Sequence, residues 1–165
     1  MKACILGARV DFFHRPFVQP LIISSGAITE ITEARAYVLI EVNGRRAWGR
    51  GAMYLSGLWA WPEPSLSHQQ RDAILRDLCL SIARDLRGLC GGEPAHPLEL
   101  GIRLHHSLVA PPPPSPSALK GAGGRGDTGP QPTALAKAMC LSPFDAAIHD
   151  AVGAALGVSA MRLYD

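Results

Sequence analysis

Clustered cysteines are missing from this chain of 165 residues. The four cysteines (Cys4, Cys79, Cys90 and Cys140) are scattered, and no two of them form a C-x-x-C pair. A zinc site needs ligands that one loop can present together, so this spacing argues against such a site. We expect reduced and mainly structural thiols, as is usual for cytoplasmic proteins.

The sequence also lacks a strong excess of charge and a long apolar run. Its 16 basic and 14 acidic side chains leave a net charge of +2, which is too balanced for charge-driven binding to nucleic acid. No run approaches the roughly 18 consecutive apolar residues that a membrane span needs. Arg9 and Asp11 interrupt the apolar start before a signal-peptide core could form. We therefore expect a cytoplasmic protein with neither a nucleic-acid nor a membrane partner.

Alternation of apolar and polar residues is present, and it predicts strands. A first strand would bury Cys4, Leu6, Ala8, Val10 and Phe12. A second strand would bury Ala34, Ala36, Val38, Ile40 and Val42. Asn43-Gly44 fits the two positive-φ positions of a type I′ turn, so that residues 45–52 return as a third strand. The pattern predicts a three-stranded, mainly antiparallel sheet with one buried face.

Two stretches beside these strands are expected to be irregular. Residues 14–32 contain Pro16, Pro20 and Gly26, which exclude a continuous helix. Residues 53–65 are rich in aromatic side chains. Because aromatic side chains are costly to expose to water, this second stretch should pack on another surface.

Helical spacing follows. Ser67 begins a capping box that opens a long helix, and Gly88 is the expected end of that helix. A shorter helix should precede the proline-rich stretch. Ser142-Pro143 combines a cap with a proline suited to the first turn, so a last helix is expected from there to Gly157.

Residues 110–132 hold seven of the 14 prolines and five of the 17 glycines, which is typical of a flexible or polyproline insert. Within the insert, residues 121–126 match G-x-G-x-x-G literally. No strand precedes them, so the pattern does not indicate a dinucleotide site. Arg125-Gly126-Asp127 resembles an integrin-type tripeptide, and we interpret it as a coincidence.

Asp145, His149 and Asp150 lie within one and a half helical turns. They could form a metal or acid–base cluster. The simpler interpretation is a cap residue and polar groups bonded to nearby backbone, and we favour it.

Three segments, taken in order, carry a family resemblance. They are Arg15-Pro16-Phe17 through Ile23-Ser24-Ser25-Gly26, Thr32-Glu33-Ala34-Arg35 through Trp48-Gly49, and Phe144-Asp145-Ala146-Ala147-Ile148-His149-Asp150 through Leu156-Gly157. Together they resemble the N-terminal domain of the mandelate racemase/muconate lactonizing enzyme group in the enolase superfamily. The sequence departs from that family at Arg50, where the family usually has Glu, and at Ala154, where it usually has Lys.

The resemblance implies an α+β capping domain, with a three-stranded sheet followed by a helical bundle. Members of the family join this domain to a (β/α)₈ barrel that holds Mg²⁺ through three carboxylates and removes a proton next to a substrate carboxylate. We expect 1–109 to be the sheet and helices of the cap and 110–132 to be the insert. Residues 133–165 should end the cap and lead to a barrel that this chain lacks. No cofactor is expected in this chain, and Mg²⁺ is expected in the parent enzyme.

By the same resemblance, residues 15–28 and 53–61 correspond to two loops that close over the barrel. Phe17, Ser24, Tyr54 and Trp59 are our candidates for substrate binding, because aromatic and hydroxyl groups could wall and orient a small carboxylate. No catalytic and no metal residue is expected. The full-length protein could be a homo-oligomer. The alternative function is a freestanding, non-catalytic interaction module that reuses the fold.

Overall fold

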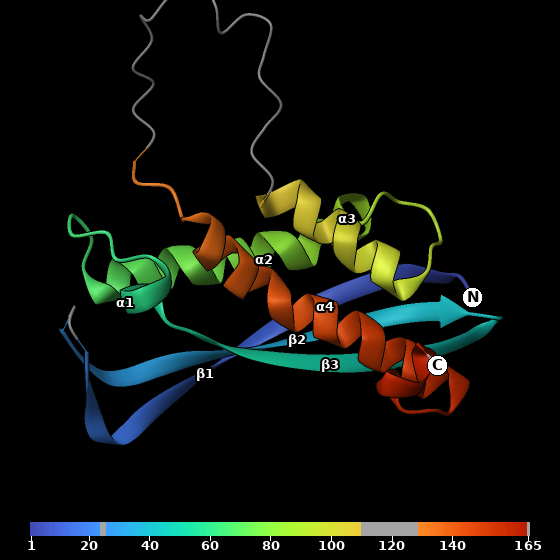
Figure 1. Cartoon of the computed structure of the whole chain (residues 1–165), viewed down its shortest axis with the longest axis horizontal. Helices are drawn as coiled ribbons and strands as arrows, with labels where there is room; N and C mark the ends of the chain where they lie inside the picture. Colours follow the sequence, from blue (N-terminus) through green and yellow to red (C-terminus); the bar gives the residue numbers. More distant parts are fainter. Residues whose placement is uncertain (24–25, 110–128, 165) are drawn as a thin grey trace, which may run out of the picture.

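The computed structural model describes residues 1–23, 26–109 and 129–164, and it shows a sheet with helices on one face (Figure 1). The elements are β1 (Ala3–Ile23), β2 (Gly26–Val42), β3 (Arg45–Leu55), α1 (Gly57–Ala60), α2 (His68–Leu89), α3 (Pro97–Val109), α4 (Ala134–Leu156) and the short 3-10 helix η2 (Ala160–Leu163). Both strand pairs are antiparallel, in the order β1-β2-β3. This confirms the expected three-stranded antiparallel sheet.

The second strand and its turn follow the sequence pattern. The five alternating apolar residues of β2 are 0–1% exposed on the face that the helices cover. Asn43 and Gly44 have φ values of 51° and 74°, as a type I′ turn requires. The turn therefore sets the register in which Val42 pairs with Arg45.

A β-bulge corrects the predicted first strand. Ile5 pairs with Ile40 and Gly7 pairs with Leu39, so Leu6 is an extra residue without a partner opposite it. One inserted residue moves every later side chain to the other face of a strand. Leu6 is accordingly 39% exposed, and the buried residues before the bulge are Ala3 and Ile5. The prediction that Cys4 and Leu6 point into the core was therefore wrong.

The stretch expected to be an irregular connection is mainly a hairpin. β1 and β2 continue as a two-stranded hairpin beyond the end of β3, where Arg15 still pairs with Ile31. The pairing shifts between Pro16 and Leu21, where two prolines lack the amide hydrogen that a ladder needs. We call residues 15–31 the arm. Residues 24–25 lie outside the described ranges.

Both ends of α2 are defined by local contacts. The hydroxyl of Ser67 accepts a hydrogen bond from the Gln70 amide at 3.2 Å, and the Gln70 side chain accepts one from the Ser67 amide at 2.8 Å. These bonds confirm the capping box. The helix ends at Leu89, one residue past Gly88, and Gly91 with a φ of 90° continues the turn.

The last helix begins earlier in the chain than its predicted start, because Thr133 rather than Ser142 is its cap. The Thr133 hydroxyl accepts a hydrogen bond from the Ala136 amide at 3.1 Å, and Pro143 lies inside α4. A proline in a helix interior is unfavourable, but α4 is buried on several sides and this packing outweighs the local preference. The predicted start was therefore wrong. The predicted end at Gly157 is confirmed by its φ of 72°.

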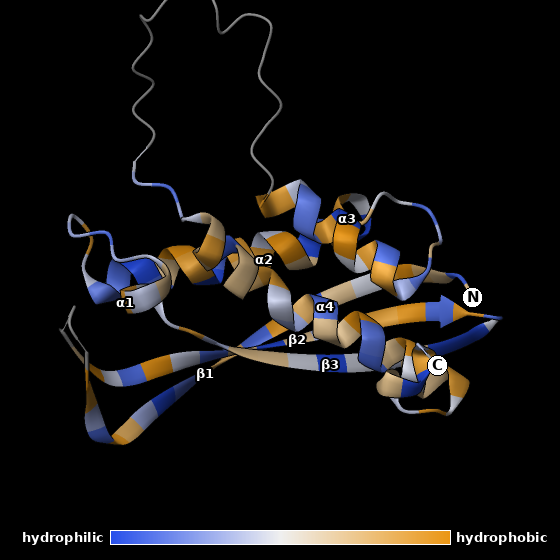
Figure 2. Ribbon diagram, viewed as in Figure 1, coloured by the Kyte–Doolittle hydropathy of each residue, from blue (hydrophilic) through white to orange (hydrophobic). Residues whose placement is uncertain are grey.

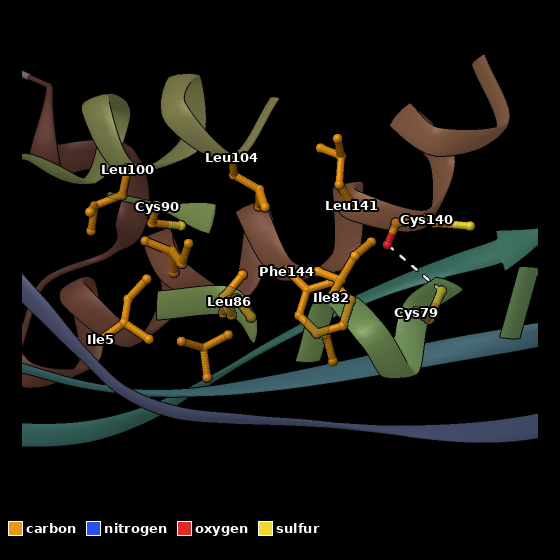
Figure 3. Close-up of a cluster of buried hydrophobic side chains, with 14 of the residues drawn as sticks. Ile5, Cys79, Ile82, Leu86, Cys90, Leu100, Leu104, Cys140, Leu141 and Phe144 are labelled. Carbon is orange, nitrogen blue, oxygen red and sulfur yellow. Dashed lines mark hydrogen bonds between the residues drawn. The ribbon is translucent and has the colours of Figure 1, made fainter. Parts of the chain in front are cut away.

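The core lies between the sheet and the helices (Figure 3). α2 packs over β1, α4 packs over β2 and β3, and α3 packs against α4. The four cysteines are free thiols, and burial raises the pKa of Cys90 to about 12. The Cys79 sulfur lies 3.8 Å from the carbonyl oxygen of Cys140, which joins α2 to α4. None of the helices in the described ranges is long and apolar enough to cross a membrane.

Candidate functional site

The two segments that were expected to face a substrate lie at the same end of the sheet. Thr32 of β2 pairs with His14 on one side and with Leu55 on the other, so the arm begins where β3 ends. α1 follows β3 directly. Figure 1 shows the arm and α1 at one end of the molecule and both chain termini at the other.

The arm carries apolar side chains that the rest of the described chain leaves uncovered. Phe17 is 39% exposed, Val18 102% and Ile22 73%. Figure 2 shows hydrophobic residues recurring along the arm as it extends beyond the helices. Apolar surface gathered on a projecting element marks a place where another surface docks. Ser24, a candidate for substrate binding, lies outside the described residues.

The aromatic segment after β3 divides between core and surface. Trp61 is only 2% exposed and belongs to the hydrophobic core. Tyr54 and Trp59 are 53% and 55% exposed. The expectation that this segment packs on another surface is therefore confirmed for Trp61, which packs against the core of its own chain. The other two aromatic side chains remain available to a ligand or a partner.

A charged cluster lies beside Tyr54 on the face of the sheet away from the helices. Glu33 accepts hydrogen bonds from Arg15 at 2.7 Å and from Arg35 at 2.6 Å, and it pairs across the strands with Tyr54. The guanidinium of Arg35 also lies 4.4 Å from the ring centre of Phe13. The hydrogen bond from Arg35 holds the pKa of Glu33 below its ordinary value against the opposing effect of burial, and Arg15 adds to the lowering.

This cluster fixes the base of the arm, because Arg15 comes from β1 and both Glu33 and Arg35 come from β2. Sequence reasoning missed it. Opposite charges on one face of neighbouring strands could have indicated it, since such cross-strand pairs stabilise a sheet.

A polar cleft lies on the other side of the arm, against the start of α2. Its volume is about 360 Å³, and it is lined by His14, Glu30, Ile31, Thr32, His68, Gln69, Asp72 and Arg76. Several of its polar groups are paired. The Nε2 atom of His14 lies 3.4 Å from Oε2 of Glu30, and the Nε atom of Arg76 lies 2.8 Å from Oδ2 of Asp72. The cleft can hydrogen-bond a small polar molecule.

The described part of the chain does not bring Asp145, His149 and Asp150 together as a metal site. The carboxylate of Asp150 accepts a hydrogen bond from the Arg50 amide at 2.8 Å, which ties α4 to β3. The Nε2 atom of His149 lies 3.5 Å from Oδ1 of Asp145, and its Nδ1 atom shares a hydrogen bond with the Tyr164 hydroxyl. Nowhere in the described ranges do three or more His, Cys, Asp or Glu residues form a group that could hold a metal ion. The three residues are polar groups bonded to neighbours, but the interpretation of Asp145 as a cap residue was wrong, because it lies inside α4 and Thr133 is the cap.

The glycine pattern at residues 121–126 and the tripeptide at 125–127 lie outside the described ranges, so neither enters the site.

Comparison with solved structures gives a likeness to an enolase from Bradyrhizobium in complex with magnesium and mandelic acid. The TM-score is 0.54 at 19% sequence identity, and the match covers 99% of this chain and 35% of that chain. The likeness confirms the α+β fold that the family resemblance implied, and this chain spans about a third of the length of the enolase. No protein-family model and no curated protein matches the chain.

Proposed function

We propose that this chain is the capping domain, or an N-terminal fragment, of a Mg²⁺-dependent enzyme of the enolase superfamily. The reaction type would be the abstraction of a proton next to a carboxylate, as in racemases, cycloisomerases and dehydratases. The chain would not be catalytic alone. The observation that carries the proposal is that the arm, Tyr54 and Trp59 lie at the same end of a fold that matches about a third of an enolase.

The arrangement fits the work of a cap. An apolar arm and exposed aromatic side chains, when closed over an active site, would exclude water and strengthen the electrostatic interactions inside it. Phe17, Tyr54 and Trp59 are the described candidates for contact with a small carboxylate substrate, and Ser24 remains a fourth. The ion cluster at Glu33 would hold the base of the arm in place.

Magnesium would bind elsewhere in the parent enzyme. Mg²⁺ prefers several oxygen ligands arranged around one point. The carboxylates in and beside the arm are already engaged, since Glu30 lies beside His14, Glu33 binds two arginines and Asp72 binds Arg76. The described residues therefore do not fit a magnesium site, and the metal and the catalytic base are assigned to a barrel.

The remaining expectations belong to the same proposal. Residues 1–109 and 133–165 would form the cap and its exit toward a barrel, on either side of the 110–132 insert. The full-length enzyme would work in the cytoplasm as a monomer or a homo-oligomer, with a small carboxylate as its partner and neither nucleic acid nor membrane.

The test uses the full-length protein encoded by the gene, with this chain alone as the comparison. Proton NMR in D₂O would follow exchange of the α-proton of a panel of 2-hydroxy carboxylates, with Mg²⁺ and with EDTA. We expect Mg²⁺-dependent exchange by the full-length protein and none by the chain alone. Trp59→Ala should raise KM by about tenfold, since it removes part of the substrate pocket. A gene without a barrel, or turnover by the isolated chain, would contradict the proposal.

A freestanding interaction module is the second candidate, because the exposure of Trp59 suits it equally well. It requires that the 165 residues act without a barrel. Capture of the same protein partner by wild type, and its loss with Trp59→Ala in a chain whose gene encodes no barrel, would favour the module.

A further inference from the structure

Arg71, in the first turn of α2, is a buried cation that forms no close ion pair among the described residues. It is 7% exposed. The nearest interacting carboxylate is that of Glu63, whose pKa is lowered mainly by hydrogen bonds from Ser65 and to a smaller extent by the charge of Arg71. The hydrogen bonds that the Arg71 side chain makes with described residues leave from Nη1, which donates to the backbone carbonyls of Glu63 at 2.6 Å and Leu66 at 2.7 Å. Its Nε is buried and has no hydrogen-bond partner in the described part of the chain.

Such an arrangement is energetically incomplete. A charge taken out of water needs an opposite charge or a full set of hydrogen bonds, and guanidinium groups are best satisfied by oxyanions that accept two parallel hydrogen bonds. Two neutral carbonyl oxygens on one nitrogen supply only part of this. An anion from outside the chain, bound beside the guanidinium, would supply the opposite charge.

Arg71 also lines a cavity that can admit such an anion. The cavity has a volume of about 160 Å³, and its other walls are Leu58, Pro62, Glu63 and Pro64. A single water molecule needs only about 10–15 Å³ by the same kind of measure, so a larger group fits. The carboxylate of Glu63 is turned to Ser65, whose amide and hydroxyl donate to it at 3.1 Å and 2.7 Å.

We propose that this cavity is a binding site for a small oxyanion, a carboxylate or a phosphate group, held by the guanidinium of Arg71. The site goes beyond the proposed capping function and does not depend on it. Arg71 packs under Gly57, where an added Cβ would lie 3.1 Å from the Cβ of Arg71. Anion binding would therefore change the packing around Gly57 at the start of α1, the helix that carries Trp59.

The experiment is a titration of the ¹⁵N-labelled chain, followed by the arginine Nε–Hε signals in ¹H–¹⁵N correlation spectra. Sodium malonate and inorganic phosphate are the two probes, and sodium chloride at equal ionic strength is the control. We expect the Arg71 signal to shift and saturate with at least one probe, with a dissociation constant in the millimolar range. Chloride should cause no saturable shift. Saturation by malonate alone identifies carboxylates as the class of ligand, and saturation by phosphate alone identifies phosphates. The Arg76 signal, from a side chain already bound to Asp72, serves as the internal control.

Two variants complete the test. Arg71→Lys keeps the charge but loses the forked geometry, and it should weaken the affinity about tenfold. Glu63→Gln removes a competing negative charge from the wall, and it should tighten binding several-fold without affecting the fold, because Glu63 is partly exposed. Absence of a saturable Arg71 shift in the folded wild-type chain would overturn the proposal. So would an affinity that Glu63→Gln leaves unchanged.

Discussion

The carbonyl oxygen of Ala147 lies 2.2 Å from the position that a Cβ at Gly49 would occupy. The amide nitrogen of Ala151 is at the same distance, so β3 and α4 meet backbone to backbone at this point. A second glycine makes a similar approach: a Cβ at Gly51 would lie 2.1 Å from the carbonyl oxygen of Pro143. The two glycines explain how α4 lies so low on the sheet that the Asp150 carboxylate reaches the Arg50 amide.

Gly49→Ala should therefore destabilise the fold by about 3 kcal/mol or more, because neither backbone can move without disturbing the sheet or the helix. Urea unfolding followed by circular dichroism measures the effect. Gly88→Ala is the matched control: the added Cβ would meet nothing within 4 Å in α2. That variant should be neutral or stabilise by up to about 1 kcal/mol. Equal effects at the two positions would contradict the close contact.

The two tryptophans of the segment after β3 should respond differently to truncation. Trp61→Ala empties a core position and should cost about 3–5 kcal/mol. Trp59→Ala removes a half-exposed side chain and should cost about 1 kcal/mol or less. Chemical unfolding gives the free energies. Acrylamide quenching in a Trp48→Phe background, which removes the third and also half-exposed tryptophan, shows whether water reaches Trp59 or Trp61. If Trp59→Ala lowers the free energy of unfolding by much more than about 1 kcal/mol, Trp59 packs within its own domain.

Thr133 connects the start of α4 to the end of α1. Its hydroxyl accepts from the Ala136 amide at 3.1 Å and donates to the Ala60 carbonyl at 2.5 Å. Thr133→Ala loses both bonds and should cost about 1–2 kcal/mol. Thr133→Ser keeps the hydroxyl and should stay within about 0.5 kcal/mol of wild type. If the serine variant is as unstable as the alanine variant, the methyl group rather than the hydroxyl matters.

Glu33 should make stability depend on pH in the acid range. Its pKa in the folded chain lies below the ordinary value of 4.5, chiefly because Arg35 donates to the carboxylate. A lowered folded pKa means that the contribution is fully present above the ordinary value. It is lost as the pH falls through the lowered one. Unfolding free energies measured from neutral pH downward should therefore fall less steeply for Glu33→Gln than for wild type.

Glu41→Gln is the control for that comparison, because it removes a more exposed carboxylate that is bound to a single arginine, Arg46, at 2.7 Å. A wild-type curve parallel to that of Glu33→Gln would show that the ion cluster contributes nothing to the folded state.

Regular periodicity carried most of the fold prediction. From Ala34 to Val42 every second residue of β2 is apolar and faces the helices, so alternation alone identified the buried face. In β1 the same rule failed at Leu6, because residues 3–6 are all apolar and residue type therefore does not show where the extra residue lies. Pro16 and Pro20 suggested a loop, yet a projecting hairpin tolerates them where the pairing is interrupted. Pro143 suggested a helix start, yet burial of α4 overrides that local signal.

The candidate site was predictable only in outline. Exposed aromatic residues such as Trp59 can be proposed from composition, but its separation from Trp61 depends on how α1 turns. The pairing of Glu33 with Arg15 depends on the register of the arm, which the sequence did not reveal. Arg71 did leave a signal, since it lies four residues before Leu75 and therefore on the buried face of α2.

The helix that completes the core is made after the sheet, α2 and α3. α4 covers much of the buried face of β2 and β3, yet it begins only at Ala134. A ribosome working from the N-terminus releases the sheet and α2 well before that helix exists. During that interval the apolar side chains of β2 have no lasting cover, so a nascent chain stalled within the insert would be a substrate for chaperones or proteases.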